Sequence, residues 1–171
     1  WSTYQVTANS VANNPSIDYN PTGVSLSGDF TLECWMFPTS YGTGSSTYND
    51  YPTAFHVTNG STGYLLGQFG QYGANASTFT FMVRDSGEKY FATAIIPLGQ
   101  WTHVAMVRSG STITAYVNGT AVGSRASTES LGASRVGIGA YTAPLRGYYG
   151  FNGNISNFRI VNGTALYTSN F

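Results

Sequence analysis

Apolar and polar residues alternate with a period of two in several short stretches of this sequence, and no other feature constrains the fold as strongly. Successive side chains of a β-strand point to opposite faces, so this alternation predicts strands with one buried face. A slip of one residue would turn each buried set outward. The residues that we expect to point inward between two sheets are Phe30, Leu32, Cys34, Met36, Phe79, Phe81, Val83, Ile113, Ala115 and Val117.

Turn residues separate these stretches. Asp-Ser-Gly-Glu links residues 78–84 to residues 89–95, which predicts a hairpin. Asn118-Gly119 is a strong hairpin signal, because both positions of that tight turn need a positive φ. Further strands are expected at 53–58, 63–69, 101–108, 134–139 and 154–161, although both faces of 101–108 are apolar and its inward face stays open. Helical periodicity is almost absent, so the pattern predicts an all-β sandwich or barrel.

Charged residues make up only 8% of the chain, and the net charge is +0. This balance argues against nucleic-acid binding, which depends on basic surfaces. No apolar run reaches the length of a membrane span. A polar, uncharged surface with 13 tyrosines suits an extracellular or closely packed setting. The single cysteine excludes an internal disulfide framework.

The residues give little sign of catalysis, and we predict that the chain is not an enzyme. Glycoside hydrolysis usually needs two carboxyl groups about 5 to 9.5 Å apart. Asp29 and Glu33 share a strand face but lie about 13 Å apart along it. Cys34 falls on the apolar face, and His56 and His103 have no partner at a zinc-like spacing. Convergence of carboxylates from separate loops stays open.

Tyrosine is frequent in the expected loops. The candidate binding residues are Tyr41, Tyr48, Tyr51, Tyr72, Tyr141, Tyr148 and Tyr149. Their rings could stack on sugars or dock against a neighbouring protein, or they could cover the open ends of the sandwich. The Gly/Ser/Tyr-rich loops 38–51 and 140–150 are the predicted partner-facing surface, rather than the hairpin region 101–123.

Three segments, taken in order, resemble a known family: SGDFTLECWMFP (27–38), LGQWTHVAMVRSGSTITAYVNGTAVG (98–123) and FNGNISNFRIVNGTALYTSNF (151–171). They are similar to the laminin-G-like, or concanavalin A-like, jelly-roll modules. The resemblance implies a two-sheet antiparallel jelly roll formed by a single domain over 1–171, as part of a longer chain. The last segment looks most like variants found in phage and other viral structural proteins.

The same resemblance limits the functional expectations. The chain lacks the Glu-x-Asp-x-Glu strand of the glucanase branch, so that activity does not carry over. Some members bind calcium, but no ligand set can be assigned here, and we predict no cofactor. Trp101 and His103 are expected to support packing and to orient the backbone, without a chemical role.

Two hypotheses of function follow. One is a carbohydrate-binding adhesion module of a virion (a tail or capsid fibre) or of an extracellular surface. The other is a structural or decoration subunit of such an assembly with no glycan ligand. The expected partners are a glycan or neighbouring protein subunits, in an oligomer or larger assembly, with neither nucleic acid nor membrane insertion.

Overall fold

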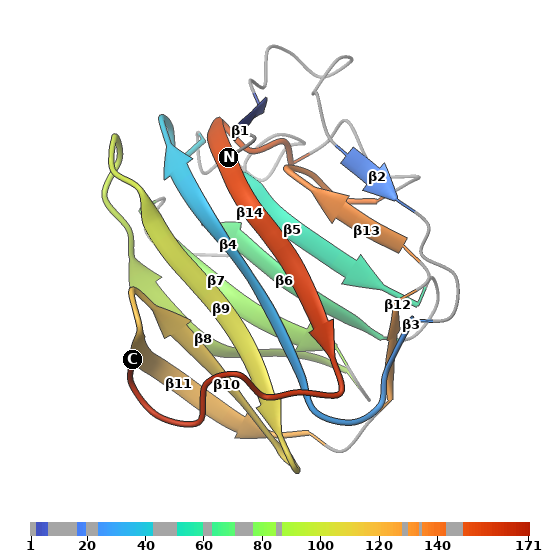
Figure 1. Ribbon diagram of the computed structural model, residues 1–171. Helices are drawn as coiled ribbons and strands as arrows, with labels where there is room; N and C mark the ends of the chain where they lie inside the picture. The colour runs from blue at the N-terminus through green and yellow to red at the C-terminus, as the bar shows by residue number, and fades with distance from the viewer. Residues whose placement is uncertain are drawn as a thin grey trace.

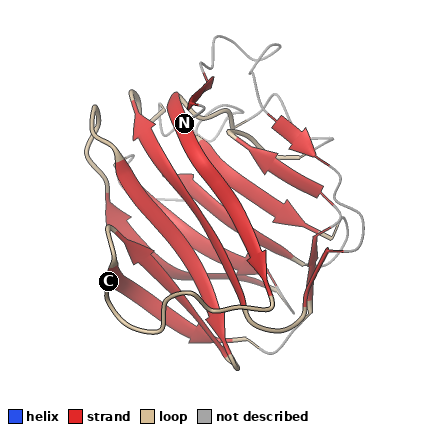
Figure 2. Ribbon diagram, viewed as in Figure 1, coloured by secondary structure: helices blue, strands red, loops and turns tan. Residues whose placement is uncertain are grey.

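The chain folds into two antiparallel β-sheets packed face to face (Figure 1). A computed structural model describes residues 3–6, 17–19, 24–42, 51–59, 63–70, 77–84, 87–127, 130–133, 135–142 and 149–171. These residues form strands and loops and no helix (Figure 2). The described part of the chain therefore offers no helix that could cross a membrane. This two-layer, all-β arrangement is the jelly-roll sandwich that the sequence predicted.

Each sheet has six strands, and a two-stranded sheet lies beside them. The first sheet runs in the order β1 (Thr3–Val6), β14 (Gly153–Asn162), β4 (Phe30–Pro38), β9 (Thr102–Ser109), β10 (Thr112–Val117) and β11 (Thr120–Ala126). The second sheet runs in the order β2 (Ile17–Tyr19), β13 (Arg135–Ile138), β5 (Thr53–Thr58), β6 (Tyr64–Phe69), β7 (Thr78–Arg84) and β8 (Glu88–Ile95). The small sheet pairs β12 (Leu131–Ala133) with β3 (Val24–Leu26).

The core lies between the two large sheets, and its register is the predicted one. Nine of the ten residues expected to point inward are completely buried, and the tenth, Val117, is partly buried and packs against them. Phe55, Phe69 and Phe151 enlarge the same cluster. All ten belong to this core cluster or pack against it, whereas Tyr116, the outward neighbour of Ala115 and Val117, belongs to a separate cluster, so the predicted register is confirmed.

Both predicted hairpins are confirmed. β7 pairs with β8, and β10 pairs with β11 around the Asn118-Gly119 turn. Asn118 has φ of 47° and Gly119 has φ of 76°, the left-handed values that this turn requires. β9 is buried on both faces, which explains why its sequence did not reveal its orientation.

Residues 163–171, here called the C-terminal strap, run across the outer face of the first sheet (Figure 1). The Thr31 hydroxyl accepts a hydrogen bond from the Leu166 backbone at 2.9 Å. Farther along, the Phe171 backbone N–H donates to the Gly119 carbonyl at 2.9 Å. These contacts hold the strap over β4 and β9 and against the β10–β11 turn.

The strap also covers a second, small apolar cluster. Ala105, Val107 and Tyr116 point outward from β9 and β10, and Ala165 and Tyr167 of the strap pack against them. The outer face of the first sheet is therefore apolar beneath the strap and open beside it. That boundary is where the candidate site lies.

Candidate functional site

An open hollow of about 1000 Å³ lies on the outer face of the first sheet, next to the strap. Its lining residues come from five places: Glu33 and Trp35 on β4, Trp101 just before β9 with His103 on it, Asn118 and Gly119 in the β10–β11 turn, Asn157, Phe158 and Arg159 on β14, and Tyr167 and Phe171 of the strap. Three neighbouring strands thus provide the base of the hollow, and the strap provides one wall.

Alternation along β4 places two of these side chains at the base. Leu32, Cys34 and Met36 point into the core, so the residues that alternate with them, Glu33 and Trp35, point outward. Trp35 lies opposite His103 in the β4–β9 ladder, with ring centroids 5.3 Å apart.

Trp101 stands at the edge of the hollow, just before β9 begins. Its ring packs against Phe37 at 5.6 Å, which agrees with the packing role expected for it. Trp101 and Trp35 nevertheless both keep 41% of their surface exposed. Tryptophan is large and mainly apolar, so two half-exposed rings in one hollow offer a substantial stacking surface.

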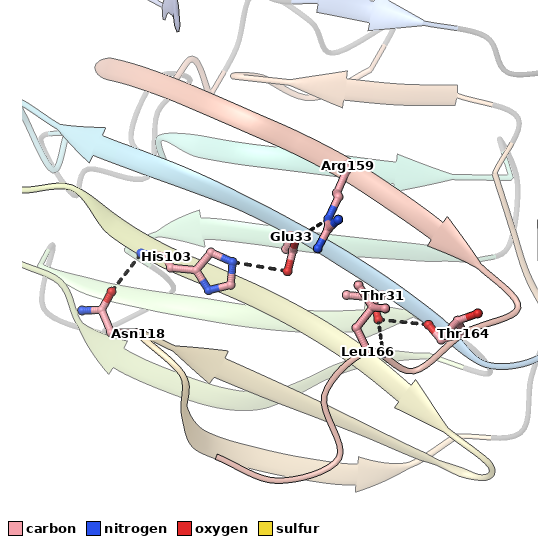
Figure 3. Close-up of polar contacts among 7 residues, drawn as sticks. All are labelled: Thr31, Glu33, His103, Asn118, Arg159, Thr164 and Leu166. Carbon is pink, nitrogen blue, oxygen red and sulfur yellow. Dashed lines mark hydrogen bonds and ion pairs between the residues drawn. The ribbon is translucent and has the colours of Figure 1, made fainter. Parts of the chain in front are cut away.

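Glu33 is the centre of a polar cluster at the base of the hollow. His103 and Arg159 reach its carboxylate from neighbouring strands, as Figure 3 shows. The Arg159 Nε donates to Glu33 Oε1, and the His103 Nε2 lies 3.3 Å from Glu33 Oε2. A bulge in β14 between Ser156 and Arg159 precedes this contact. Together the contacts tie β4, β9 and β14 across the outer face.

Burial and charge affect the groups of this cluster differently. Burial lowers the pKa of His103, and the nearby Glu33 carboxylate partly opposes that change. Hydrogen bonding to Glu33 raises the pKa of Arg159, which therefore stays charged. Burial, followed by interaction with Glu33, raises the pKa of Tyr167. Because the ordinary pKa of histidine is already below 7, this lowering leaves the His103 imidazole neutral at neutral pH, beside the Glu33–Arg159 ion pair.

Two stacked rings of the strap form one wall of the hollow. Tyr167 and Phe171 lie 3.6 Å apart and are tilted by only 11°. Both meet His103 edge-on, at 6.4 Å and 5.8 Å. A Cβ atom on Gly119 would overlap the Phe171 carbonyl oxygen, so glycine is needed there for close approach as well as for the turn.

This arrangement can bind a ligand but offers little for catalysis. Among the described residues that line the hollow, Glu33 is the single carboxylate. The described ranges contain no group of three or more His, Cys, Asp or Glu side chains that could hold a metal ion. Cys34 is buried, and burial strongly raises the pKa of its thiol, so it cannot serve as a nucleophile. The expectation that the chain needs no cofactor stays a prediction.

The four candidate tyrosines that the structure describes, Tyr41, Tyr51, Tyr141 and Tyr149, do not line the hollow. Tyr48, Tyr72 and Tyr148 fall outside the described residues. Tyr41 packs against Phe69 with ring centroids 5.4 Å apart, and its hydroxyl donates to the Ile96 carbonyl at 2.8 Å. This contact agrees with the alternative that loop tyrosines cover an end of the sandwich.

Three further candidates gather around one histidine of the second sheet. Tyr141 stacks on His56 at 4.4 Å, Tyr149 lies 5.0 Å from Tyr141, and Tyr51 stacks on Tyr149 at 5.9 Å. With Tyr64, whose ring meets His56 edge-on at 5.3 Å, these residues are here called the His56 cluster. None of them lines the hollow. Their role in binding stays a prediction.

The residues of the hollow were not among the candidate binding residues predicted from the tyrosine-rich loops. A signal was present, because Glu33 and Trp35 fall on the face of their strand that points away from the core. The strand pairing could not be read, however, and neither could the path of the strap. Glu33 and Arg159 are 126 residues apart in the sequence, and only the sheet brings them together.

Comparison with known families agrees with the fold. The model of the concanavalin A-like lectin/glucanases superfamily matches residues 11–167, so the chain belongs to this superfamily. This confirms the resemblance inferred from the sequence motifs. No curated protein sequence shows a significant match.

Solved structures share the fold at low sequence identity. A heptameric SAP-like pentraxin from Limulus polyphemus has a TM-score of 0.68 at 16% identity, covering 92% of this chain and 74% of its own. Domains LG4-5 of mouse laminin alpha1 give 0.67 at 14% identity, covering 98% of this chain and 44% of that one. The CBM40 of a Ruminococcus gnavus IT-sialidase, bound to alpha2,3 sialyllactose, gives 0.62 at 15% identity, covering 94% and 95%.

Proposed function

We propose that this chain is a non-catalytic glycan-binding module and that its ligand occupies the hollow beside the strap. One observation carries the proposal: Trp35 and Trp101, each 41% exposed, line an open hollow that also contains the buried Glu33 carboxylate. Flat aromatic faces suit the apolar faces of sugar rings, and a few fixed polar groups suit their hydroxyls.

The size of the hollow supports the same function. Small-molecule sites typically enclose about 300–1,000 Å³, and this one reaches the upper end of that range. The CBM40 with a similar fold holds a sialylated sugar, which supports the use of this scaffold for glycans. The sequence likeness is too low to carry over its ligand.

The proposed setting follows from composition and resemblance. We place the module on an extracellular surface or in a virion assembly, where a surface with few charges is suitable. Residues 1–171 would form one domain of a longer chain, and the loops 38–51 and 140–150 would face neighbouring subunits of an oligomer. The single carboxylate of the described lining supports binding without hydrolysis.

The test is a glycan array on the purified chain, followed by titration of Trp35→Ala and Trp101→Ala. Removing a central aromatic contact should cost about 2 kcal/mol or more, close to a 30-fold loss of affinity. Tyr19→Ala is the matched control, because Tyr19 is 61% exposed on β2 and does not line the hollow.

Full affinity in both tryptophan variants would place the glycan elsewhere. No binding on the array would favour the alternative function, a structural subunit without a glycan ligand.

A further inference from the structure

We infer that the hollow selects uncharged glycans and discriminates against acidic ones, because its positive and negative charges are already paired with each other. The inference rests on the proposed function, since it names the chemical class of ligand for the same site. It follows from the charges of the hollow, from the partners of its polar groups and from its aromatic lining.

The formal charges of the described lining cancel. Glu33 and Arg159 are its two charged side chains, and they form an ion pair. The Glu33 side chain is 8% exposed, whereas that of Arg159 is 53% exposed. Burial lowers the pKa of His103 and so keeps its imidazole neutral near pH 7. The hollow therefore has no net charge to offer a ligand.

An acidic sugar would gain little here. Its carboxylate would be attracted by Arg159 but repelled by Glu33, whose charge lies against the same guanidinium. It would also lose water, and that desolvation is repaid only when the new partners are free to compensate it. Outside the hollow the chain has a net charge of +0, so no overall field draws a polyanion toward the site.

An uncharged sugar fits the remaining groups. Asn118 accepts a hydrogen bond from the His103 backbone N–H through Oδ1 at 2.9 Å, which orients its amide at the edge of the hollow (Figure 3). Asn157 adds a second amide on the opposite side. Amide groups both donate and accept, as hydroxyl groups do. The rings of Trp35 and Trp101 supply stacking that depends on no charge.

The first experiment titrates the unmodified chain, following tryptophan fluorescence or heat release. One ligand set contains uncharged oligosaccharides of glucose, galactose, xylose and arabinose with three to six units. The other contains sialyllactose, oligogalacturonate and heparin fragments. We expect uncharged ligands to bind with an affinity that NaCl does not change, and acidic ligands to bind about tenfold more weakly or not at all.

The second experiment changes the charge balance with Glu33→Gln, which keeps the shape of the side chain and leaves Arg159 uncompensated. Affinity for the acidic set should rise about tenfold and fall again with added salt. The double variant Glu33→Gln with Arg159→Gln restores neutrality and should remove that gain. Melting curves report whether each variant folds. If Glu33→Gln does not fold, the comparison of the unmodified chain with the single variant Arg159→Gln still decides the question.

The outcomes separate the two proposals. Acidic glycans that bind the unmodified chain as tightly as uncharged ones, and that lose affinity in Trp35→Ala, would overturn the selectivity and leave the glycan site in place. Binding that is insensitive to Trp35→Ala for every ligand would overturn the site itself, and the selectivity with it.

Discussion

The two sheets of this protein each carry aromatic and polar residues on their outer sides, but they use them differently. In the hollow of the first sheet, Trp35 and Trp101 stay half exposed and face open space. In the His56 cluster of the second sheet, rings stack on one another, and His56 itself is only 6% exposed. Aromatic content alone therefore does not identify a binding surface, because rings that satisfy one another have less area left for a ligand.

The histidines of the two regions show the same contrast. His56 accepts a hydrogen bond from the Thr142 backbone N–H at its Nδ1, 3.3 Å away, and burial lowers its pKa to about 4. His103 is also buried, but the Glu33 carboxylate beside it opposes the lowering of its pKa. One histidine packs against the rings of Tyr64 and Tyr141, and the other belongs to a charged cluster open to the hollow.

The largest expected effect is a loss of stability in acid that originates from His56. Its folded pKa of about 4 lies below the ordinary value of 6.5, so between these values the unfolded chain binds a proton that the folded chain does not. Stability is then fully present above pH 6.5, falls as the pH decreases, and has lost about 3 kcal/mol once the pH is below 4.

Urea unfolding at pH 7, 6, 5 and 4 measures this loss. The interval from pH 6.5 to 5 is the informative one, since most carboxyl groups titrate below it. In His56→Gln the slope across that interval should flatten, whereas an equally steep slope would assign the effect to other groups. NMR titration of the two histidines would show directly whether His56 has the lower pKa.

A smaller effect is expected from the tyrosines of the His56 cluster. Tyr51→Ala and Tyr149→Ala each remove a ring from the Tyr51–Tyr149 stack, and the free energy of unfolding should fall by about 1 kcal/mol. Glycan affinity should not change, because neither residue lines the hollow. Thermal melts and glycan titrations of the same samples compare the two regions, and lost binding with unchanged melting would restore the loops as the ligand surface.

The smallest effect concerns the wall of the hollow. Phe171→Ala removes one ring of the Tyr167–Phe171 stack, and we expect about a threefold loss of glycan affinity. Gly119→Ala should weaken binding in the same direction, because its methyl group would push Phe171 away. Gly110→Ala is a suitable control, since its Cβ would meet no atom, while the positive φ of each glycine, 58° at Gly110 and 76° at Gly119, strains the backbone in both variants. Equal affinity in Gly119→Ala and Gly110→Ala would mean that the strap takes no part in binding.

Much of the fold could be predicted from the sequence. The core face of β4, β7 and β10 follows from alternation over seven residues or fewer, and the β10–β11 turn follows from two residues. These signals are local, because each strand carries its own inward and outward faces. The sequence of β9 did not reveal which face points inward, because both of its faces are apolar. Ala165 and Tyr167 of the strap bury its outer face.

The sequence by itself determined that the side chains of Glu33 and Trp35 would lie on the strand face that points away from the core, and that Asn118-Gly119 would form a turn. Only the tertiary structure decided that β4 would lie between β9 and β14, which brings His103 and Arg159 to Glu33. Strand order depends on pairing between distant segments and on the burial of two whole faces, and no short pattern encodes it. The strap's path was decided in the same way, by an apolar patch that exists only after the sheet has formed.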